Sequence, residues 1–393
     1  MKTYTNLKVP RLIKRILVFL FFIFNFSFLI NGQDSCRLRI SLLTCTPGEE
    51  LYSTFGHSAI RVVDGKYDIV FNYGTFDFDD PDFYTKFTRG KLLYYLSTEE
   101  FDSFKEAYRR DKRGITEQVL NLNCNEKKRM YSLLLNNLQD SNKFYKYDFL
   151  FDNCTSRLRD LLEKSSDSSV QFARIVKEKS TFRKSIYQYL NNNDKQWSKL
   201  GIDLLLGAKL DAVMNNRQVM FLPDYLMNTF DSSTIGNKPV VASKTIVVPY
   251  GEIRQSGNFF SGPIFIFSLL LIIVVVLTAS KNQRIQRSLT AFDGFLFFLT
   301  GAIGMLILFM WFGTEHVMCK DNYNLLWAWP THAFFAFVMN RNRKWVTKYF
   351  RATAIIYSLL LLVWFFLPQH LNTALIPIVL LMIFRSGIRG YKK

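Results

Sequence analysis

Histidine and cysteine are scarce in this chain of 393 residues, which has four histidines and five cysteines. Residues 34–258 contain a single histidine, His57, so a metal site there has few possible ligands and none is expected. The chain also lacks a GxxxxGK[ST] loop and an HExxH pair, and Gly56-His57-Ser58 fails as a GxSxG elbow because position 60 is Ile. These absences exclude a nucleotide as phosphate donor, a zincin protease and an elbow-type serine nucleophile, and no cofactor is expected.

Acidic residues are the minority charge, with 32 Asp plus Glu against 50 Lys plus Arg and a formal net charge of +18. A nucleic-acid module would concentrate such an excess on a folded surface. Residues 34–258 are instead almost neutral, with 32 basic and 29 acidic side chains, and most of the net charge flanks apolar runs in residues 1–33 and 259–393. That distribution follows the positive-inside rule of membrane proteins, and nucleic acid is not an expected partner.

Residues 1–33 have the pattern of a signal peptide or of an uncleaved N-terminal anchor. Basic residues that include Lys8, Arg11, Lys14 and Arg15 precede an apolar run from Ile16 to Ile30, which ends at Asn31-Gly32. The run has 15 residues, whereas a helix needs about 20 apolar residues to cross ~30 Å of hydrocarbon. Under either interpretation the chain is exported from residue 34 onward.

Residues 259–393 contain five apolar segments, which predict an all-α bundle of about five transmembrane helices at 259–280, 289–313, 323–339, 352–368 and 371–388. Basic residues gather in the first loop, the third loop and the tail, whereas the second and fourth loops, 314–322 and 369–371, share one base. This alternation places residues 34–258 on the outer side of the membrane. Asp293 and His332 fall within the segments and are expected to face the bundle interior.

Residues 34–258 begin with a predicted strand at 37–43, where apolar residues alternate with polar ones. Two more strands, 57–63 and 66–73, flank Asp64-Gly65, a pair that favours a two-residue hairpin turn. Residue 63 is then expected opposite residue 66. The same register places Arg61 opposite Asp68 and, at the end of the hairpin, His57 opposite Asn72.

Helices are predicted at 98–109, with acidic residues in the first turn, and at 125–138. Residues 144–151 are aromatic and predicted to be extended. Leucines at helical spacing follow Asp152-Asn153-Cys154, which places Cys154 in the first turn of a helix, just past an Asp or Asn cap. Cys45 and Cys124 are candidates for a disulfide, whereas Cys36 and Cys45 are separated by a strand and are not expected to pair.

Cys154 and His57 are the candidate nucleophile and base. Proteins lower the pKa of a thiol in the first turn of a helix beside an imidazole, and His57 is the only imidazole available in the exported residues. Asn72 is placed to hold the tautomer of the ring, and the Cys154 N–H to supply part of an oxyanion hole. The alternative is that Cys154 is an inert small hydrophobe and His57 a structural residue at a strand edge.

Two segments, 47–62 (PGEELYSTFGHSAIRV) and 147–157 (YDFLFDNCTSR), resemble the Bacteroidota lipoprotein N-acyltransferases that have an Lnb-type N-terminal periplasmic domain. Residues 200–211, 221–223 and 322–330 are similar to the same family, and the match covers most of residues 36–393. The resemblance implies that residues 34–258 form an α+β, permuted papain-like periplasmic domain of the NlpC/P60 type. In that fold the strand with the catalytic His precedes the helix with the Cys, which is the order found in this chain.

The resemblance also implies lipoprotein N-acyltransferase activity in the bacterial inner membrane. An acyl chain of a membrane phospholipid would pass to Cys154, and from there to the α-amine of the N-terminal diacylglyceryl-cysteine of a lipoprotein. His57 would act as general base and then as general acid. The role of Asn72 rests on the hairpin register and not on the resemblance.

Four further residues are candidates for substrate binding: Arg157, Tyr52, Glu315 and His316. Arg157 lies one turn from Cys154 and is placed to meet a lipid phosphate, with a solvated helix arginine as the alternative. Tyr52 belongs to the first matching segment. Glu315 and His316 fall in an outer loop near the lipid surface and are placed to meet a head group, with a plain interfacial pair as the alternative. Two other functions stay open, namely a cell-wall peptidase or amidase of the NlpC/P60 type, which would rarely need five spans, and a non-catalytic binding module. The oligomeric state also stays open.

Overall fold

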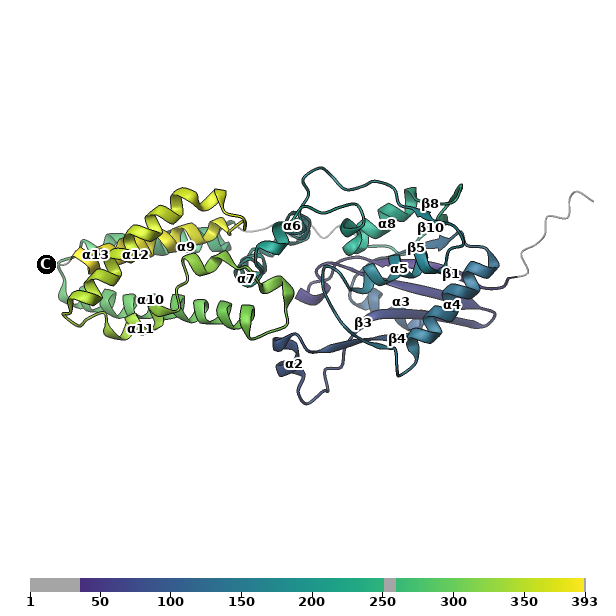
Figure 1. The fold of residues 1–393 in the computed structure, drawn as a ribbon, viewed down its shortest axis with the longest axis horizontal. Coiled ribbons are helices and arrows are strands. Elements are labelled where there is room, and N and C mark those ends of the chain that lie inside the picture. The colour runs from purple at the N-terminus through teal and green to yellow at the C-terminus, as the bar shows by residue number, and fades with distance from the viewer. Residues whose placement is uncertain (1–35, 251–258, 392–393) are drawn as a thin grey trace, which may run out of the picture.

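The computed structural model describes residues 36–250 and 259–391, which form an α+β domain and a helical bundle arranged end to end (Figure 1). The predicted signal peptide or anchor lies outside the described residues.

The N-terminal domain is built on an antiparallel sheet of seven strands in the order β10-β5-β1-β2-β3-β4-β6. Its strands are β1 (Arg39–Cys45), β2 (His57–Asp64), β3 (Tyr67–Thr75), β4 (Leu93–Glu100), β5 (Ile115–Leu120), β6 (Phe144–Lys146) and β10 (Val241–Val248). A small sheet of β7 (Val170–Gln171), β8 (Thr234–Ile235) and β9 (Lys238–Pro239) lies apart from it. The three strands predicted at the start of the domain are present, each within about two residues of its predicted bounds.

The predicted register of the β2–β3 hairpin is wrong. Asp64 pairs with Tyr67 and belongs to β2, so the turn residues are Gly65 and Lys66. Gly65 has φ 59° at the first turn position, the pattern of a type II′ turn, and no positive φ is needed at Asp64. Arg61 therefore faces Val70, but its guanidinium still reaches the diagonal Asp68 with bonds of 2.7 and 2.6 Å.

The helix predicted at 98–109 begins later than expected. Residues 97–100 continue β4, because they pair with β3 as far as Ile69↔Glu100, and α3 runs from Phe101 to Arg110. The next prediction is confirmed: α4 spans Cys124–Leu138 and begins with a capping box between Asn123 and Glu126. Of the aromatic segment 144–151, only the first three residues form a strand.

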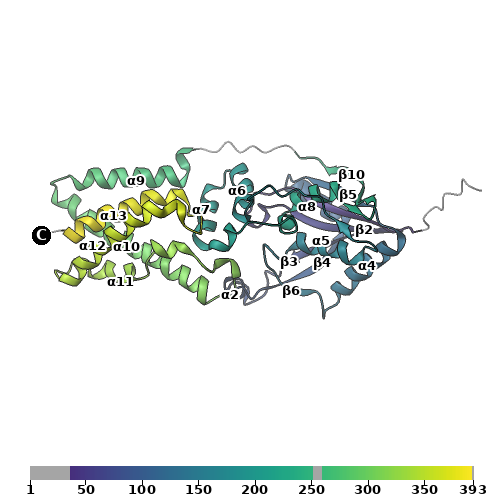
Figure 2. The same cartoon turned by 45° about the horizontal axis from the view of Figure 1, so that its top comes forward.

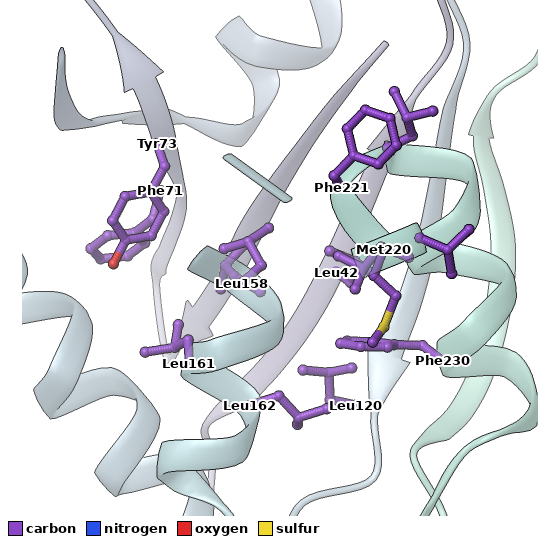
Figure 3. Close-up of a cluster of buried hydrophobic side chains, with 14 of the residues drawn as sticks. Leu42, Phe71, Tyr73, Leu120, Leu158, Leu161, Leu162, Met220, Phe221 and Phe230 are labelled. Carbon is purple, nitrogen blue, oxygen red and sulfur yellow. The ribbon is translucent and has the colours of Figure 1, made fainter. Parts of the chain in front are cut away.

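Helices cover both faces of the large sheet. On one face, α4, α5 (Cys154–Ser165) and α8 (Pro223–Ser232) enclose the main core, in which leucines of α5 lie between Phe71 and Tyr73 on one side and Leu42 and Met220 on the other (Figure 3). On the opposite face α3 covers a smaller cluster that includes Leu43, Cys45 and Phe104. Leu42 and Leu43 thus serve different cores, as the two-residue period of a strand requires.

The disulfide predicted between Cys45 and Cys124 is wrong, because Cys124 pairs with Cys36. Cys36 precedes β1 and lies beside the start of α4, with 5.5 Å between the two Cα atoms. Cys45 ends β1 on the far side of the strand and is a free, fully buried thiol. The expectation that Cys36 and Cys45 do not pair agrees with this arrangement.

The C-terminal residues form a helical bundle of α9 (Pro263–Thr278), α10 (Gln283–Phe312), α11 (Thr331–Val338), α12 (Lys344–Val363) and α13 (Ile376–Tyr391). Within the described residues, three stretches are long and apolar enough to cross a membrane, namely 283–312, 344–366 and 373–391, and α9 is a shorter apolar helix of 16 residues. The span predicted at 323–339 is not one continuous helix. Its eight-residue helix α11 is only ~12 Å long. It packs against α10 at Gly301, and the segment just before it packs against α10 at Gly304.

Polar side chains in the bundle face its interior, as expected. Asp293 and His332 are fully buried, and Asp293 pairs with Arg385 and Arg389. His332 lies between the hydroxyl groups of Tyr349 and Tyr357.

The loops with few basic residues are the ones that touch the N-terminal domain. Helices α6 (Phe182–Asn192) and α7 (Gln196–Leu205) lie between the sheet and the bundle (Figure 2). Asn322 donates to the carbonyl of Leu204, and Gln369 to that of Leu206, with 2.8 and 3.0 Å between the atoms. The second and fourth loops of the bundle therefore lie on the side of the N-terminal domain, which agrees with the orientation predicted from the charges.

Candidate active site

Cys154 is the first residue of α5, as predicted. Asn153 caps the helix: its Oδ1 accepts from the backbone N–H groups of Thr155 and Ser156, and the Ser156 hydroxyl accepts from the N–H of Asn153 at 2.8 Å. The amide nitrogen of Asn153 also donates to the carbonyls of Phe149 and Phe221. Contacts outside α5 therefore help to hold the start of the helix in place. Cys154 lies at this start and is half-buried.

The thiol of Cys154 and the imidazole of His57, which is the first residue of β2, lie side by side because α5 packs against that strand. Burial raises the pKa of Cys154, but the charge and hydrogen bond of His57 and the backbone N–H of Ser58 lower it, with a net shift from 9.0 to about 7. Burial lowers the pKa of His57, whereas Cys154 and Asn72 raise it, and the net shift is upward. Both shifts favour a thiolate beside an imidazolium, the reactive form of such a pair.

Asn72, from β3, contacts His57 although the register differs from the prediction. The Oδ1 of Asn72 lies 3.2 Å from His57 Nε2, and its amide nitrogen donates to Glu99 Oε1 at 2.9 Å. Because Glu99 can only accept while ionised, it orients the amide so that the oxygen faces the imidazole. His57 Nε2 is then the donor, which leaves Nδ1 for the sulfur.

The weaker candidates do not gather around the thiol. Arg157 forms a two-bond ion pair with Asp152, at 2.7 and 2.8 Å, and its guanidinium lies over the Tyr145 ring. Tyr52 is largely exposed in a short 3-10 turn before β2. Glu315 pairs with Lys146 and Lys91, and His316 lies 3.0 Å from the carbonyl of Phe87. Glu315 and His316 therefore join a loop of the bundle to the N-terminal domain.

Sequence reasoning missed three features of the site. Glu99 was assigned to a helix, and only its pairing in β4 brings it to Asn72. The Ser58 N–H approaches the thiol, and no pattern around Ser58 indicates this. Gly74 has φ 95°, and a side-chain carbon there would lie 3.6 Å from the Tyr147 ring and 3.8 Å from the Cβ of Cys154. A glycine two residues after Asn72 was the one available indication of a close approach.

A polar cavity of about 1000 Å³ opens near the residues that precede His57. Its lining includes five basic residues, Arg110, Lys112, Arg113, Lys177 and Lys195, and three acidic ones, Glu49, Asp111 and Asp224. Arg113 acts electrostatically on His57, and Lys195 donates to Thr54 Oγ1 at 2.8 Å and to the carbonyl of Gly48 at 3.2 Å. The cavity is thus adjacent to the site and carries an excess of positive charge.

Two family models match the chain. One, described as the Lnb N-terminal periplasmic domain, matches residues 29–192, and the other, described as the Lnb transmembrane domain, matches residues 254–393. No curated protein and no solved structure matches the chain. The first model contains the segments of Cys154, His57, Asn72 and Glu99, and the second contains all five helices of the bundle.

Proposed function

The chain belongs to the Lnb family and is a membrane protein with a periplasmic domain, and from this premise we propose that it is a lipoprotein N-acyltransferase with Cys154 as the nucleophile. The observation that carries the proposal is the thiol at the start of α5, whose pKa is lowered beside His57. Such a thiol attacks an acyl carbon at neutral pH. The membrane domain supports a lipid as the acyl donor, because both proposed substrates are held in the bilayer by their chains.

The reaction has two acyl transfers. In the first, the Cys154 thiolate attacks an ester carbonyl of a phospholipid, the ester C–O bond breaks, and the leaving alkoxide takes a proton from the His57 imidazolium. In the second, the α-amine of a diacylglyceryl-cysteine attacks the thioester and loses a proton to His57, and the C–S bond breaks to return the thiolate. The sequence ester, thioester, amide needs no nucleotide.

Each residue has one role in this scheme. His57 is the general base and acid, and Asn72, oriented by Glu99, holds the imidazole with Nδ1 toward the sulfur. The backbone N–H of Cys154 lies in the first turn of α5, where amides have no acceptor within the helix, and is available to the oxyanion of the tetrahedral intermediate. The excess of basic residues in the cavity supports binding of the phosphate group of the donor lipid there.

The finer assignment of fold and location is part of the proposal. A half-buried Cys at the start of a helix, packed on an antiparallel sheet that presents the His and Asn, supports a permuted papain-like fold of the NlpC/P60 type. The base-poor loops on the side of the periplasmic domain support a multi-pass protein of the inner membrane.

The test is the mass of the purified full-length protein after incubation with phospholipid vesicles. One acyl mass is expected on the wild type and should map to Cys154. The Cys154→Ala variant should gain none, and the Cys45→Ala control, which removes a fully buried thiol, should behave as wild type.

In cells, the Cys154→Ala variant should leave lipoproteins diacylated with a free N-terminus. Lipoproteins that stay N-acylated would refute the transferase, and altered muropeptides in their place would indicate a cell-wall peptidase. If the variant changes neither lipoproteins nor muropeptides, the domain is a non-catalytic binding module.

A further inference from the structure

A row of aromatic rings links the segment after β3 to the interior of the N-terminal domain. Tyr147 and Tyr94 stack with ring centroids 4.5 Å apart, and Tyr94 meets Phe76 edge to face at 5.2 Å. Phe76 in turn contacts the rings of Phe78 and Phe83 at 4.6 and 5.9 Å, and Phe83 stacks on Phe87. We define the aromatic strip as these six residues, Phe76, Phe78, Phe83, Phe87, Tyr94 and Tyr147.

The outer end of the strip is unusually exposed. Helix α2 (Phe83–Arg89) has no buried residue, and the exposed fractions of Phe78, Tyr84 and Phe87 are 68%, 83% and 50%. Three large rings are exposed within ten residues, each in contact with Phe83, although Asp77, Asp79 and Asp82 are exposed in the same stretch. Such a cluster of exposed rings in a folded domain marks a contact with a partner or a membrane.

Contacts with the bundle place the exposed rings of α2 relative to the membrane. Both views place α2 at the end of the N-terminal domain that faces the bundle (Figures 1 and 2). The carbonyl of Arg89 accepts from the N–H of Glu315 at 2.9 Å, and the carbonyl of Phe87 lies 3.0 Å from His316 Nε2. Glu315 comes three residues after α10 ends at Phe312. Since α10 is long and apolar enough to span a bilayer, its end and the attached α2 lie at the outer membrane surface.

A second group of exposed aromatic residues also lies where the bundle meets the outer membrane surface. Phe259 and Phe260 are about two-thirds exposed just before α9, and Trp197 of α7 donates to the carbonyl of Ser261 at 2.9 Å. Aromatic side chains are enriched where spans meet the headgroups. The bilayer surface at the start of α9 and the end of α10 is therefore lined by aromatic residues that include those of α2.

The inner end of the strip is at the nucleophile. A side-chain carbon at position 74 would lie within 4 Å of both the Tyr147 ring and the Cβ of Cys154, so the ring and the nucleophile border the same space. The absence of a side chain at Gly74 keeps that space open. Contacts between neighbouring rings thus run from α2 to Tyr147, the residue beside the nucleophile.

We propose that α2 dips into the outer leaflet and that the aromatic strip binds the acyl chain of the donor lipid on its way to Cys154. This proposal rests on the acyltransferase function and adds where the donor chain binds. A lipid chain is the occupant that the structure favours over a protein segment, because α2 is hydrogen-bonded to the loop that follows a membrane span.

The membrane half of the proposal is tested without activity. In a Cys154→Ser background, Tyr84→Cys is labelled with bimane and the full-length protein is placed in nanodiscs that contain brominated phospholipid. Strong quenching is expected at position 84. The control is Tyr67→Cys, an exposed tyrosine at the hairpin turn, which the eight residues of β2 place at the opposite end from His57, ~26 Å away. Equal quenching at both positions, or none at position 84, would overturn the placement of α2.

The binding half is tested by comparing donors of different chain length. Acyl-Cys154 formation is measured with a long-chain phospholipid in nanodiscs and with a short-chain, water-soluble phospholipid. In Phe78→Ser/Phe87→Ser, the ratio of the long-chain to the short-chain rate should fall at least roughly 10-fold, because two rings no longer contact the chain. Tyr67→Ser should leave the ratio unchanged.

The two hypotheses fail in different ways. If the wild type forms no thioester with either donor, the acyltransferase function fails, and quenching still decides the position of α2. If the wild type is acylated and the double variant keeps the wild-type ratio, the chain does not use the strip, and the acyltransferase function stands.

Discussion

Two thiols of the N-terminal domain show what makes one of them reactive. Burial has the largest effect on the pKa of both Cys45 and Cys154, and in both it acts upward. For Cys45 burial prevails and the pKa rises to about 12, even though Tyr108 and Arg113 lower it. For Cys154 the neighbouring His57 reverses the shift and the pKa falls to about 7. The largest of the effects that lower the pKa of Cys154 come from the imidazole of His57, which has no counterpart among the effects on Cys45.

Replacing His57 should raise the pKa of Cys154. In His57→Ala the effect of burial remains and the main lowering cause is gone, so the pKa should rise from about 7 toward the ordinary value of 9.0. The measurement is the rate of alkylation by iodoacetamide against pH. The wild-type rate should fall as pH drops through about 7, because the thiolate becomes protonated, and the variant should show this fall at a clearly higher pH. A variant midpoint that stays near 7 would mean that His57 does not act on the thiol.

Asn72 should matter for the rate and little for lipid affinity. In Asn72→Ala the imidazole loses the acceptor at Nε2, and thioester formation should slow on the order of 10-fold or more, as for other residues that orient a catalytic histidine. The change should appear in kcat with KM nearly constant. Glu99→Gln, which keeps the shape and can still accept from the amide, should have a smaller effect. An increase in KM with unchanged kcat would contradict the orienting role.

The sequence predicted the Cys and the His because each follows from a local pattern, a capped helix start for one and a hairpin strand for the other. Asn72 was predicted from a register that proved wrong, yet it contacts His57, because side chains reach diagonal as well as direct partners across two strands. Glu99 was not predicted. Its role depends on β4 pairing with β3, a contact between residues 27 apart that no local pattern specifies.

At the level of helices and strands, errors arose where tertiary contacts override local preference. Thr98, Glu99 and Glu100 have the composition of a helix start, but pairing with β3 keeps them extended. The segment expected to span at 323–339 is mostly apolar, but Asn322 and Asn324 donate to carbonyls of α7 and hold the chain in 3-10 turns. Local sequence patterns could not predict the pairing of Cys124 with Cys36 either, because it depends on how α4 packs beside β1 in the folded domain.

The contact between α10 and the segment just before α11 should not tolerate a methyl group at Gly304. A Cβ there would lie 2.0 Å from the carbonyl oxygen of Ala328, a backbone atom that cannot move aside easily. Gly304→Ala should therefore lower the melting temperature of the detergent-solubilised protein, with a loss of roughly 1 to 3 kcal/mol. Gly294→Ala in the same helix is the matched control, since its Cβ would meet Ala336 at 3.8 Å. It should be neutral or stabilising by up to about 1 kcal/mol, and equal losses in both variants would refute the packing argument.

In the whole molecule, a buried polar network joins the N-terminal domain to the bundle. Asp203 of α7 is fully buried, pairs with Arg183 at 2.5 Å and accepts from Tyr187. Across the junction, Asn372 donates to the Asp203 carboxylate at 2.8 Å and Asn324 to its backbone carbonyl at 2.7 Å. Buried polar groups are costly to leave without hydrogen-bond partners. This network therefore fixes the orientation of the N-terminal domain relative to the bundle. The position of α2 at the membrane depends on the same junction.

Asn372→Leu should uncouple lipid delivery from the chemistry of the thiol. The substitution removes the hydrogen bond from Asn372 to Asp203. Arg183 still neutralises the carboxylate and Tyr187 still donates to it, so the domain should fold with a loss of about 1 to 3 kcal/mol at the junction. Acylation from nanodisc phospholipid should slow, whereas the alkylation midpoint of Cys154 should stay near 7, because the surroundings of His57 are unchanged. Asn340→Leu, at the far end of the bundle where Asn340 accepts from Arg389, is the control and should match the wild type. A shifted alkylation midpoint in Asn372→Leu would show that the junction affects the active site itself. An unchanged acylation rate would show that the N-terminal domain can bind membrane lipid without a fixed orientation on the bundle.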